Sequence, residues 1–291
     1  MAESILRQIE RLDPTRDHQR IVFLCTCYDF SFDTTRALEF ALFRTFAVPS
    51  IAALLDRTGE FQKRPQKRYD DTDIIVSELM EWGYDSERGA AALARMNLIH
   101  GHFAIANDDF LYVLSTFVYE PIRWNRRFGW RPMVEHEKLA MFHFWRAVGA
   151  RMGIRDIPED YAAFEAFNRR YEREMVAPSA AAGRTGSATR ELFASWFPAA
   201  LKPLVRHAIH AMMDDATRAA FGFPDAPAWI KRSVLGAMAL RARLLRLLPK
   251  RRKPRLRTAM RRRSYPGPYR LDQVGPPFVT EKSERRQSSE V

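Results

Sequence analysis

The chain has 291 residues, of which 46% are hydrophobic, and this is enough to bury one sizeable core. Its two cysteines, Cys25 and Cys27, are too few for a disulfide framework, which suits a reducing compartment. The N-terminus carries no apolar segment of the signal-peptide type, and no 18 consecutive residues are free of charge. The sequence therefore predicts a cytoplasmic protein without a transmembrane helix, and it leaves association with a membrane surface open.

Most of the chain has the pattern of helices, because apolar residues recur at spacings of three and four. The pattern is clearest in three segments, residues 35–55, 86–106 and 135–152. Ser86 is the expected N-cap of the second segment, with Glu87 well placed in its first turn. Sustained alternation with a period of two is missing, so the sequence predicts an all-α domain.

Three local features interrupt this helical pattern. Residues 21–27 are a candidate short buried strand, although one strand makes no sheet. Asn107-Asp-Asp is expected to cap a helix over residues 110–119, which Glu120-Pro121 then breaks or kinks. Residues 178–187 are rich in Ala, Gly and Ser, which predicts a long internal loop.

Positive charge is concentrated near the C-terminus. Residues 231–263 contain 14 Lys or Arg and no acid, so the rest of the chain is close to neutral although the whole has a formal net charge of +12. A basic segment can bind nucleic acid or an anionic membrane surface. The sequence argues against nucleic acid, because the segment has no interleaved aromatic residues for stacking and no recognisable binding motif.

Residues 230–248 predict a basic amphipathic helix. At 100° per residue, one face is apolar and three arginines gather opposite. The apolar set is Ile230, Val234, Ala237, Met238, Leu244, Leu245 and Leu248, and the arginines are Arg232, Arg243 and Arg246. Arg241 falls inside the apolar face, with a stem long enough to reach out of it. Two interpretations stay open: an interfacial membrane anchor, or a helix packed on the domain with its basic side in solvent.

These patterns divide the chain into three parts. We expect a lead-in over residues 1–19, a single domain over 20–248, and a basic, partly extended tail over 249–291.

His100 is the histidine whose surroundings best suit a metal-bound prosthetic group. On a helix its face includes Met96 and Phe103 and is largely apolar, and Gly101 beside it leaves room for a flat ligand. A haem iron takes one neutral imidazole from an apolar wall. Asn97, or the Met96 carbonyl, is a candidate partner for the other ring nitrogen. From these residues alone, a satisfied core histidine is the competing interpretation.

Several motifs carry a family resemblance through their order and spacing. They are Ala41-Leu-Phe-Arg-Thr-Phe-Ala-Val-Pro49, Arg95-Met-Asn-x-x-His100, Asn107-Asp-Asp-x-Leu-Tyr112, Glu120-Pro-x-Arg-Trp124, Phe144-Trp-x-x-x-Gly149 and Tyr265-Pro-x-x-Tyr-x-Leu. Together they resemble the mpaB-type oxygenases, whose catalytic domain is shared with bacterial rubber oxygenase (latex clearing protein). The resemblance covers about residues 20 to 275.

The resemblance implies a helical, globin-related fold that binds haem b, with His100 as the iron ligand. It also implies that Arg68 and Thr72 occupy the arginine and threonine positions of a distal Arg-x-x-x-Thr motif. In that role Arg68 stabilises negative charge on dioxygen and Thr72 donates a hydrogen bond. Asp71 stands where rubber oxygenase has a lysine, and it is a candidate to orient Arg68 or to accept a proton. A capped, salt-bridged helix start is the competing interpretation of these residues.

We therefore expect a haem-dependent oxygenase that uses dioxygen on a small lipophilic substrate, with oxidative cleavage of an isoprenoid C=C bond as the chemistry that the resemblance implies. Two alternatives remain. One is a non-catalytic helical protein that binds anionic membranes through residues 231–263, and the other is a haem sensor or carrier without turnover.

Overall fold

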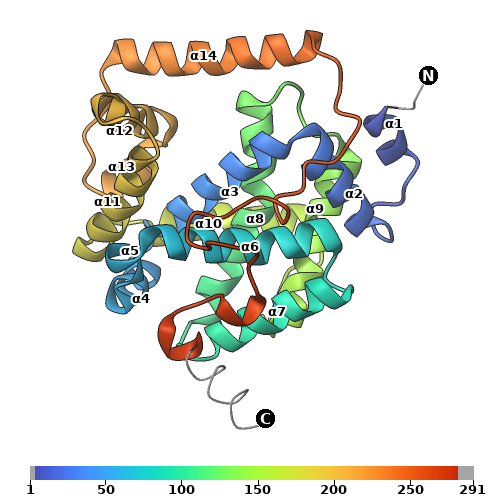
Figure 1. Cartoon of the computed structure of the whole chain (residues 1–291), viewed down its shortest axis with the longest axis horizontal. Helices are drawn as coiled ribbons and strands as arrows, with labels where there is room; N and C mark the ends of the chain where they lie inside the picture. Colours follow the sequence, from blue (N-terminus) through green and yellow to red (C-terminus); the bar gives the residue numbers. More distant parts are fainter. Residues whose placement is uncertain (1–3, 281–291) are drawn as a thin grey trace.

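The computed structural model describes residues 4–280, and within them the chain forms helices with no strand (Figure 1). The predicted all-α class is confirmed. The α-helices are α1 (Ile5–Glu10), α2 (His18–Leu24), α3 (Ser31–Thr45), α4 (Pro49–Thr58), α5 (Glu60–Lys63), α6 (Pro65–Trp82), α7 (Glu87–His100), α8 (Asn107–Phe128), α9 (Glu135–Arg151), α10 (Tyr161–Met175), α11 (Ala180–Ser195), α12 (Lys202–Met212), α13 (Asp215–Ala220) and α14 (Ala228–Leu247). Shorter helical turns are η1 (Cys25–Asp29), η2 (Ala199–Leu201) and η3 (Leu271–Gln273).

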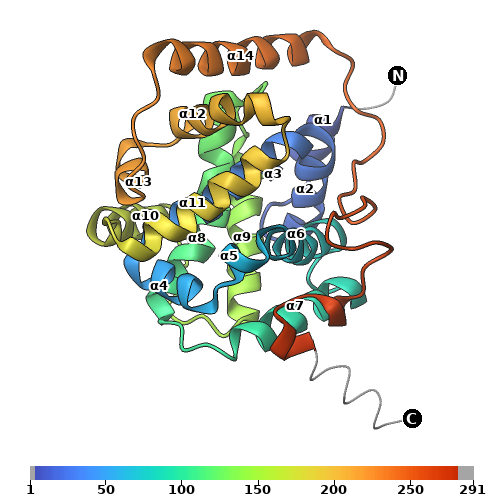
Figure 2. The same ribbon diagram turned by 60° about the vertical axis from the view of Figure 1, so that its left-hand side comes forward.

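The main hydrophobic core surrounds α8, which packs against α3, α9 and α10 (Figure 2). This core also includes residues from both ends of the described chain. Ile9 of α1 and Val274 beyond η3 are fully buried in the same cluster as Tyr119 of α8. The expected lead-in and the first part of the expected tail are therefore built into the domain that they flank.

The segment after α14 crosses the body of the molecule. Figure 1 shows α14 lying along one side, next to α12, and the chain then returning across α6 to α7. Arg95 of α7 donates to the carbonyls of Val274 (2.7 Å) and Asp272 (2.8 Å), so hydrogen bonds fix this return.

Two predictions of helix continuity concern proline; the first was wrong, and of the break or kink predicted at Pro121 the structure shows no break. The helix predicted over residues 35–55 divides at Pro49, where α3 and α4 meet at 97°. Pro49 occupies the first turn of α4 and holds Val48 in an extended conformation, which ends the preceding helix. In contrast, α8 continues through Pro121, where a break or kink was expected.

Two segments predicted as non-helical are helical. Residues 21–27 form the end of α2 and part of η1, because their apolar side chains pack on α9 rather than pairing as a strand. The loop expected over 178–187 is the first half of α11, capped by the Ser179 hydroxyl. Its small residues allow close packing, since a Cβ on Gly186 would lie 2.6 Å from the Phe221 ring.

The predicted start of α7 is confirmed, because the Ser86 hydroxyl accepts a hydrogen bond from the Gly89 amide at 3.0 Å. Its end comes earlier than expected, at His100 instead of residue 106. Across residues 4–280, no helix on its own has the length and hydropathy needed to cross a bilayer. The bent pair formed by α3 and α4 meets that test by length and composition.

Candidate active site

A large cavity lies among α4, α6, α7 and α8. Its volume is about 1530 Å³, including space that is open to solvent. Its walls are mainly apolar and include Ile51, Leu54, Ile75, Ile99, Phe110 and Val113.

His100 lies in the last turn of α7 and lines this cavity. Its ring packs edge-to-face on Phe110, with 5.4 Å between the ring centroids. The Nδ1 atom is buried and forms no hydrogen bond with any residue from 4 to 280. Burial, and then the positive charge of Arg68, lower the pKa of His100 to about 4. The imidazole is therefore neutral at pH 7 and has an unused ring nitrogen.

Arg68 brings a buried positive charge to the same cavity from α6. Its guanidinium donates to the Thr72 hydroxyl one turn later and lies over the Phe61 ring, 5.4 Å from the ring centroid. Within residues 4–280, no carboxylate lies within ion-pair distance of Arg68. Burial lowers the pKa of Arg68. An unpaired cation in an apolar cavity is suited to stabilising negative charge on a ligand.

Asp71 has a structural role that the sequence did not predict. Its buried carboxylate accepts hydrogen bonds from the Tyr265 hydroxyl (2.6 Å) and the Gly275 amide (3.0 Å), and it forms an ion pair with Lys67. It forms no hydrogen bond with Arg68 in the described part of the chain. The expectation that Asp71 orients Arg68 is therefore corrected: Asp71 fastens the C-terminal segment to α6.

Asn97 and Gly101 do not line the cavity. The Asn97 amide donates to the Arg151 carbonyl at 3.0 Å, so it does not support the His100 ring as expected. Gly101 caps the end of α7. It was expected to leave room for a flat ligand, but it does not line the cavity. Of the predicted site residues, the structure therefore brings together His100, Arg68, Thr72 and Asp71.

Sequence reasoning missed two contributors to the cavity. Trp145 of α9 lines it, and its indole Nε1 is buried without an acceptor in the described residues. Gly275 and Pro276 close another part of the wall. Trp145 belongs to one of the family motifs, but no local signal places Gly275 beside α6, 204 residues away along the chain.

His210 is the other histidine with a strongly lowered pKa, to about 4, mainly because of burial. Its ring stacks on Phe223, with 4.7 Å between centroids, and its Nε2 lies 3.4 Å from a guanidinium nitrogen of Arg190. It does not line the large cavity. Nδ1 of His210 is also buried without a partner in the described residues, so what separates His100 from His210 is its place in the wall of the large cavity.

The donor set of the cavity limits which metal centre it can hold. Residues 4–280 contain no group of three or more His, Cys, Asp or Glu arranged around a common point for a metal ion. A single histidine can serve as the axial ligand of a metal whose other donors come from a macrocycle. The neutral His100 ring, with its unpartnered Nδ1 in an apolar cavity, fits haem in this respect.

Comparison with known proteins assigns the class of this chain. The family model for the catalytic domain described as "ER-bound oxygenase mpaB/B'/Rubber oxygenase" matches residues 37–247. The chain therefore belongs to this family of oxygenases, which are oxidoreductases, and the resemblance noted in the sequence is confirmed. The matched range includes His100, Arg68 and Thr72, while Gly275 lies beyond it.

Three fungal proteins show the similarity directly. ER-bound oxygenase mpaB of Penicillium roqueforti (strain FM164) is 29% identical over 210 residues, which cover 66% of this chain and 70% of that protein. ER-bound oxygenase mpaB' of Penicillium brevicompactum is 28% identical over 220 residues, covering 69% of this chain and 52% of the relative. ER-bound oxygenase mpaB of the same species is 35% identical over 132 residues, covering 43% and 34%.

The substitution Asp71→Asn tests whether Asp71 holds the C-terminal segment against α6. Loss of its negative charge leaves the half-buried Lys67 unpaired, so we expect the free energy of unfolding to fall by about 2 kcal/mol. Trypsin should also cut faster within the basic segment after α14. The control Asp56→Asn breaks a surface pair with Arg184 far from that segment, and it should cost less than about 1 kcal/mol. If Asp71→Asn has wild-type stability and a wild-type rate of trypsin cleavage, Asp71 does not hold the C-terminal segment in place.

Proposed function

We propose that this protein is a haem-dependent oxygenase that acts on a lipophilic substrate. The observation that carries the proposal is the neutral imidazole of His100, which lines a large apolar cavity and has an unpartnered Nδ1 within the described chain. Membership of an oxygenase family supports the reaction class.

His100 is the residue that would hold the haem iron. The side chain of a histidine binds a metal in its neutral form, and burial keeps this ring neutral well below pH 7. When bound, haem supplies the iron centre at which dioxygen reacts. The apolar walls around His100 keep bulk water away from that chemistry.

Arg68 supplies the electrostatic part of the mechanism. Its guanidinium is held by Thr72 and by the Phe61 ring, so it need not reorganise when negative charge develops on a reacting oxygen atom. The low dielectric of the cavity strengthens this interaction. Membership of an oxygenase family favours turnover over a haem sensor or carrier.

The apolar walls favour a lipophilic substrate, and the family includes rubber oxygenase. We therefore propose oxidative cleavage of a C=C bond in an isoprenoid chain. In this reaction both bonds of the alkene break, and each carbon takes one atom of dioxygen to form a carbonyl group. The products are two carbonyl compounds, and no further oxidant is needed.

The absorption spectrum of the haem-reconstituted protein tests the cofactor assignment. His100→Ala should remove the Soret band of specifically bound haem, because it removes the iron ligand. The matched control is His102→Ala, since His102 is exposed and its ring bonds the Leu98 carbonyl at 2.7 Å. This control should keep the band. Equal spectra for the two variants would contradict the assignment, and oxygen uptake with a polyprenyl compound then tests turnover.

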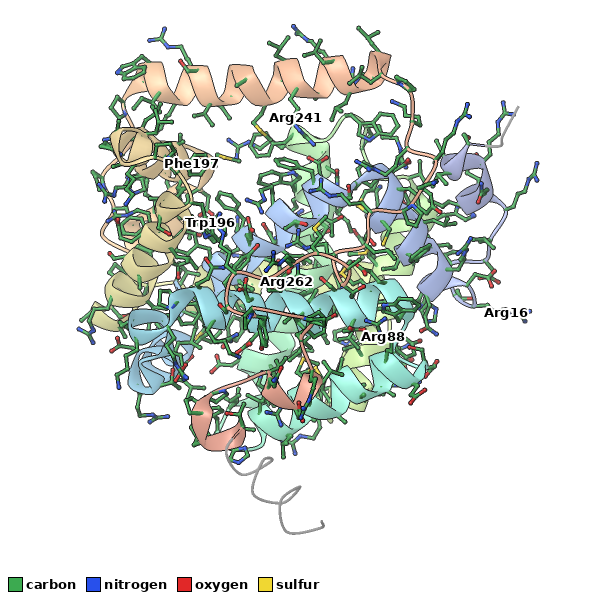
Figure 3. All side chains as sticks on the ribbon, in the orientation of Figure 1. Arg16, Arg88, Trp196, Phe197, Arg241 and Arg262 are labelled. Carbon is green, nitrogen blue, oxygen red and sulfur yellow. The ribbon has the colours of Figure 1, made fainter. Side chains whose placement is uncertain are left out.

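A second proposal concerns the association of this protein with a membrane surface. The relatives carry the printed description "ER-bound", and α14 has the composition of an interfacial helix. The face predicted to enter a membrane is mostly turned inward. Ile230 is buried, and Arg241 forms an ion pair with buried Asp33 at 2.9 Å (Figure 3). Of the two interpretations left open, the packed helix fits this part of the face, although Leu244 and Leu248 of the same set are 51% and 55% exposed.

A second apolar stripe of α14, beside the predicted face, meets solvent. Trp229, Leu240 and Leu247 are 61%, 56% and 84% exposed, and they fall on one side of the helix at 100° per residue. Arg243 lies beside this stripe, and the exposed basic run 250–253 follows the helix. We propose that this outward face lies on an anionic membrane surface, with the aromatic and leucine side chains inserted and the basic residues near lipid headgroups.

Liposome co-sedimentation tests this second proposal. The double substitution Leu240→Glu and Leu247→Glu should reduce binding to vesicles of phosphatidylcholine and phosphatidylserine at least tenfold, because it puts charge on the inserted face. As the control, Leu98→Glu changes a half-exposed leucine on α7, and it should leave binding unchanged. If the double variant binds vesicles as tightly as the wild type, α14 does not contact the membrane.

A further inference from the structure

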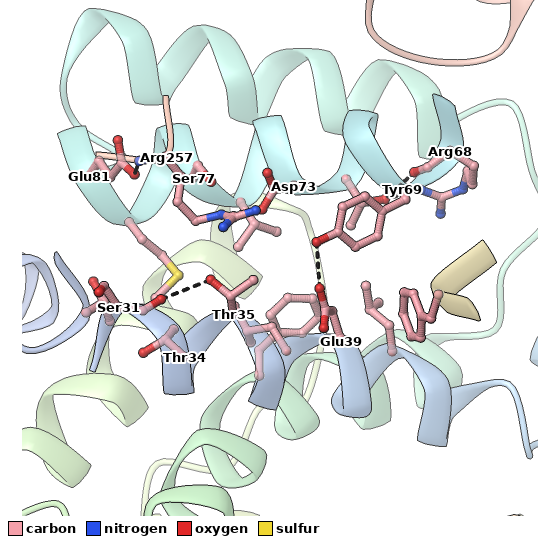
Figure 4. A pocket seen from close by; sticks show the side chains of 18 of the residues that line it. Ser31, Thr34, Thr35, Glu39, Arg68, Tyr69, Asp73, Ser77, Glu81 and Arg257 are labelled. Atoms are coloured by element: carbon pink, nitrogen blue, oxygen red, sulfur yellow. Dashed lines mark hydrogen bonds and ion pairs between the residues drawn. The ribbon is translucent and has the colours of Figure 1, made fainter. Parts of the chain in front are cut away.

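A second cavity runs between α3 and α6, and we call it the slot (Figure 4). Its volume is about 950 Å³, including space open to solvent. The slot shares part of its lining with the large cavity that His100 lines. The residues that line both are Leu42, Phe46, Arg68, Thr72, Val76 and Phe117. The slot therefore begins at the arginine and threonine of the proposed reaction site.

The slot is elongated along α6. Its lining follows α6 from Arg68 to Glu81, and the thirteen steps between these residues span about 20 Å at a rise of 1.5 Å each. Near Arg68 the facing side chains are apolar, including Leu42 and Phe46. These dimensions suit an extended chain lying along the helix better than a compact molecule.

The far end of the slot is polar. The hydroxyls of Ser31, Thr34 and Ser77 line it, and within residues 4–280 their side chains form no hydrogen bond with another protein group. Thr34 and Ser77 are nevertheless buried, at 6% and 5% exposure. Buried hydroxyls without partners leave donors and acceptors free for the polar end of a ligand.

The acids at this end already have hydrogen-bond or ion-pair partners within the protein. Asp73 forms ion pairs with Arg257 and Arg262, each at 2.7 Å. Glu81 accepts hydrogen bonds from the Thr258 amide (3.1 Å) and the Thr258 hydroxyl (2.6 Å). These carboxylates therefore have partners and are not open to a cationic ligand.

Glu39, near the middle of the slot, also has partners. It pairs with Arg36 at 2.6 Å and accepts a hydrogen bond from the Tyr69 hydroxyl, also at 2.6 Å. Burial raises the pKa of Glu39 to about 7, so it carries less than a full negative charge near neutrality.

Arg255 is an exposed cation that lines the slot and has no such partner within residues 4–280. Its backbone amide is fixed to the Cys27 carbonyl at 2.8 Å, which holds the residue beside the slot. Its side chain forms no ion pair or hydrogen bond in the described part of the chain. Arg251, Arg257 and Arg36 all add positive potential around it. An anionic group is the ligand chemistry that this arrangement favours.

We propose that the slot binds an elongated amphiphile whose apolar chain lies between α3 and α6 and whose anionic head group, a carboxylate or a phosphate, pairs with Arg255. The other end of the chain then meets Arg68 and Thr72, next to His100. The identity of this ligand as a substrate rests on the proposed oxygenase function, whereas its binding does not.

Competition binding against a fluorescent long-chain fatty acid tests the proposal on the purified full chain. The competitors are hexadecanoate, hexadecyl phosphate and hexadecan-1-ol. We expect at least one of the two anions to bind ten times more tightly than the alcohol, and the comparison between them identifies the head group. Equal affinity of the alcohol and both anions would overturn the proposal.

Two substitutions locate the head group. Arg255→Glu should weaken binding of the preferred anion at least tenfold and leave the alcohol unchanged. Arg252→Glu makes the same charge change at a neighbouring exposed arginine that does not line the slot, and it should have little effect. If both variants weaken binding equally, the effect is one of general charge and the Arg255 site is rejected.

A third variant separates this proposal from the proposed function. Ser77→Phe fills the slot away from Arg68, so it should abolish binding of acid and alcohol alike while the Soret band is retained. Circular dichroism checks that it folds, and Ser77→Leu is the smaller alternative. Head-group discrimination without haem binding would reject the oxygenase alone. A normal Soret band, with equal binding of the anions and the alcohol, would reject the slot proposal and leave the oxygenase proposal standing.

Discussion

The electrostatics of the large cavity depend on one constraint: Arg68 is buried there without a carboxylate partner. An isolated buried cation costs several kcal/mol unless other groups compensate it. The Thr72 hydroxyl and the Phe61 ring offset part of that cost, but neither carries a full negative charge. The field of Arg68 also helps to lower the pKa of His100, which stays neutral. A positive charge and a neutral imidazole therefore share one apolar space because α6 and α7 pack together.

A second constraint comes from the C-terminal segment, which completes the cavity after crossing the domain. Asp71 joins α6 to Tyr265 and Gly275, and Arg95 holds the same segment from α7. The resemblance to rubber oxygenase made Asp71 conspicuous, because a lysine stands there in that enzyme. In this chain Asp71 forms its ion pair with Lys67, and that pair supports the wall of the cavity instead of its chemistry.

Local patterns predicted much of the fold and part of the site. The spacing of apolar residues predicted the helical class, and the capping rule placed Ser86 correctly at the start of α7. Composition misled at α11, because small residues there serve close packing against Phe221 and not a loop. Periodicity also misled at α14, where apolar residues occur on both faces. There the inward face carries buried Ile230 and Ala242 together with the ion pair of Arg241 with Asp33, and no sequence pattern contains that ion pair.

The site shows the same limit. The motif resemblance predicted that His100, Arg68 and Thr72 belong together, and they do line one cavity. The return of Gly275 to α6 and the continuity of the slot with that cavity depend on contacts between distant segments. Local sequence carries no signal for such contacts, since they follow from how the helices pack.

The position of iron in crystals of the haem-reconstituted protein tests the central claim most directly, through anomalous scattering at the iron absorption edge. We predict a single strong iron peak beside the His100 ring, inside the cavity among α6, α7 and α8. An iron peak beside another histidine, such as His210, or no peak in this cavity from crystals that retain the Soret band, would contradict the role assigned to His100.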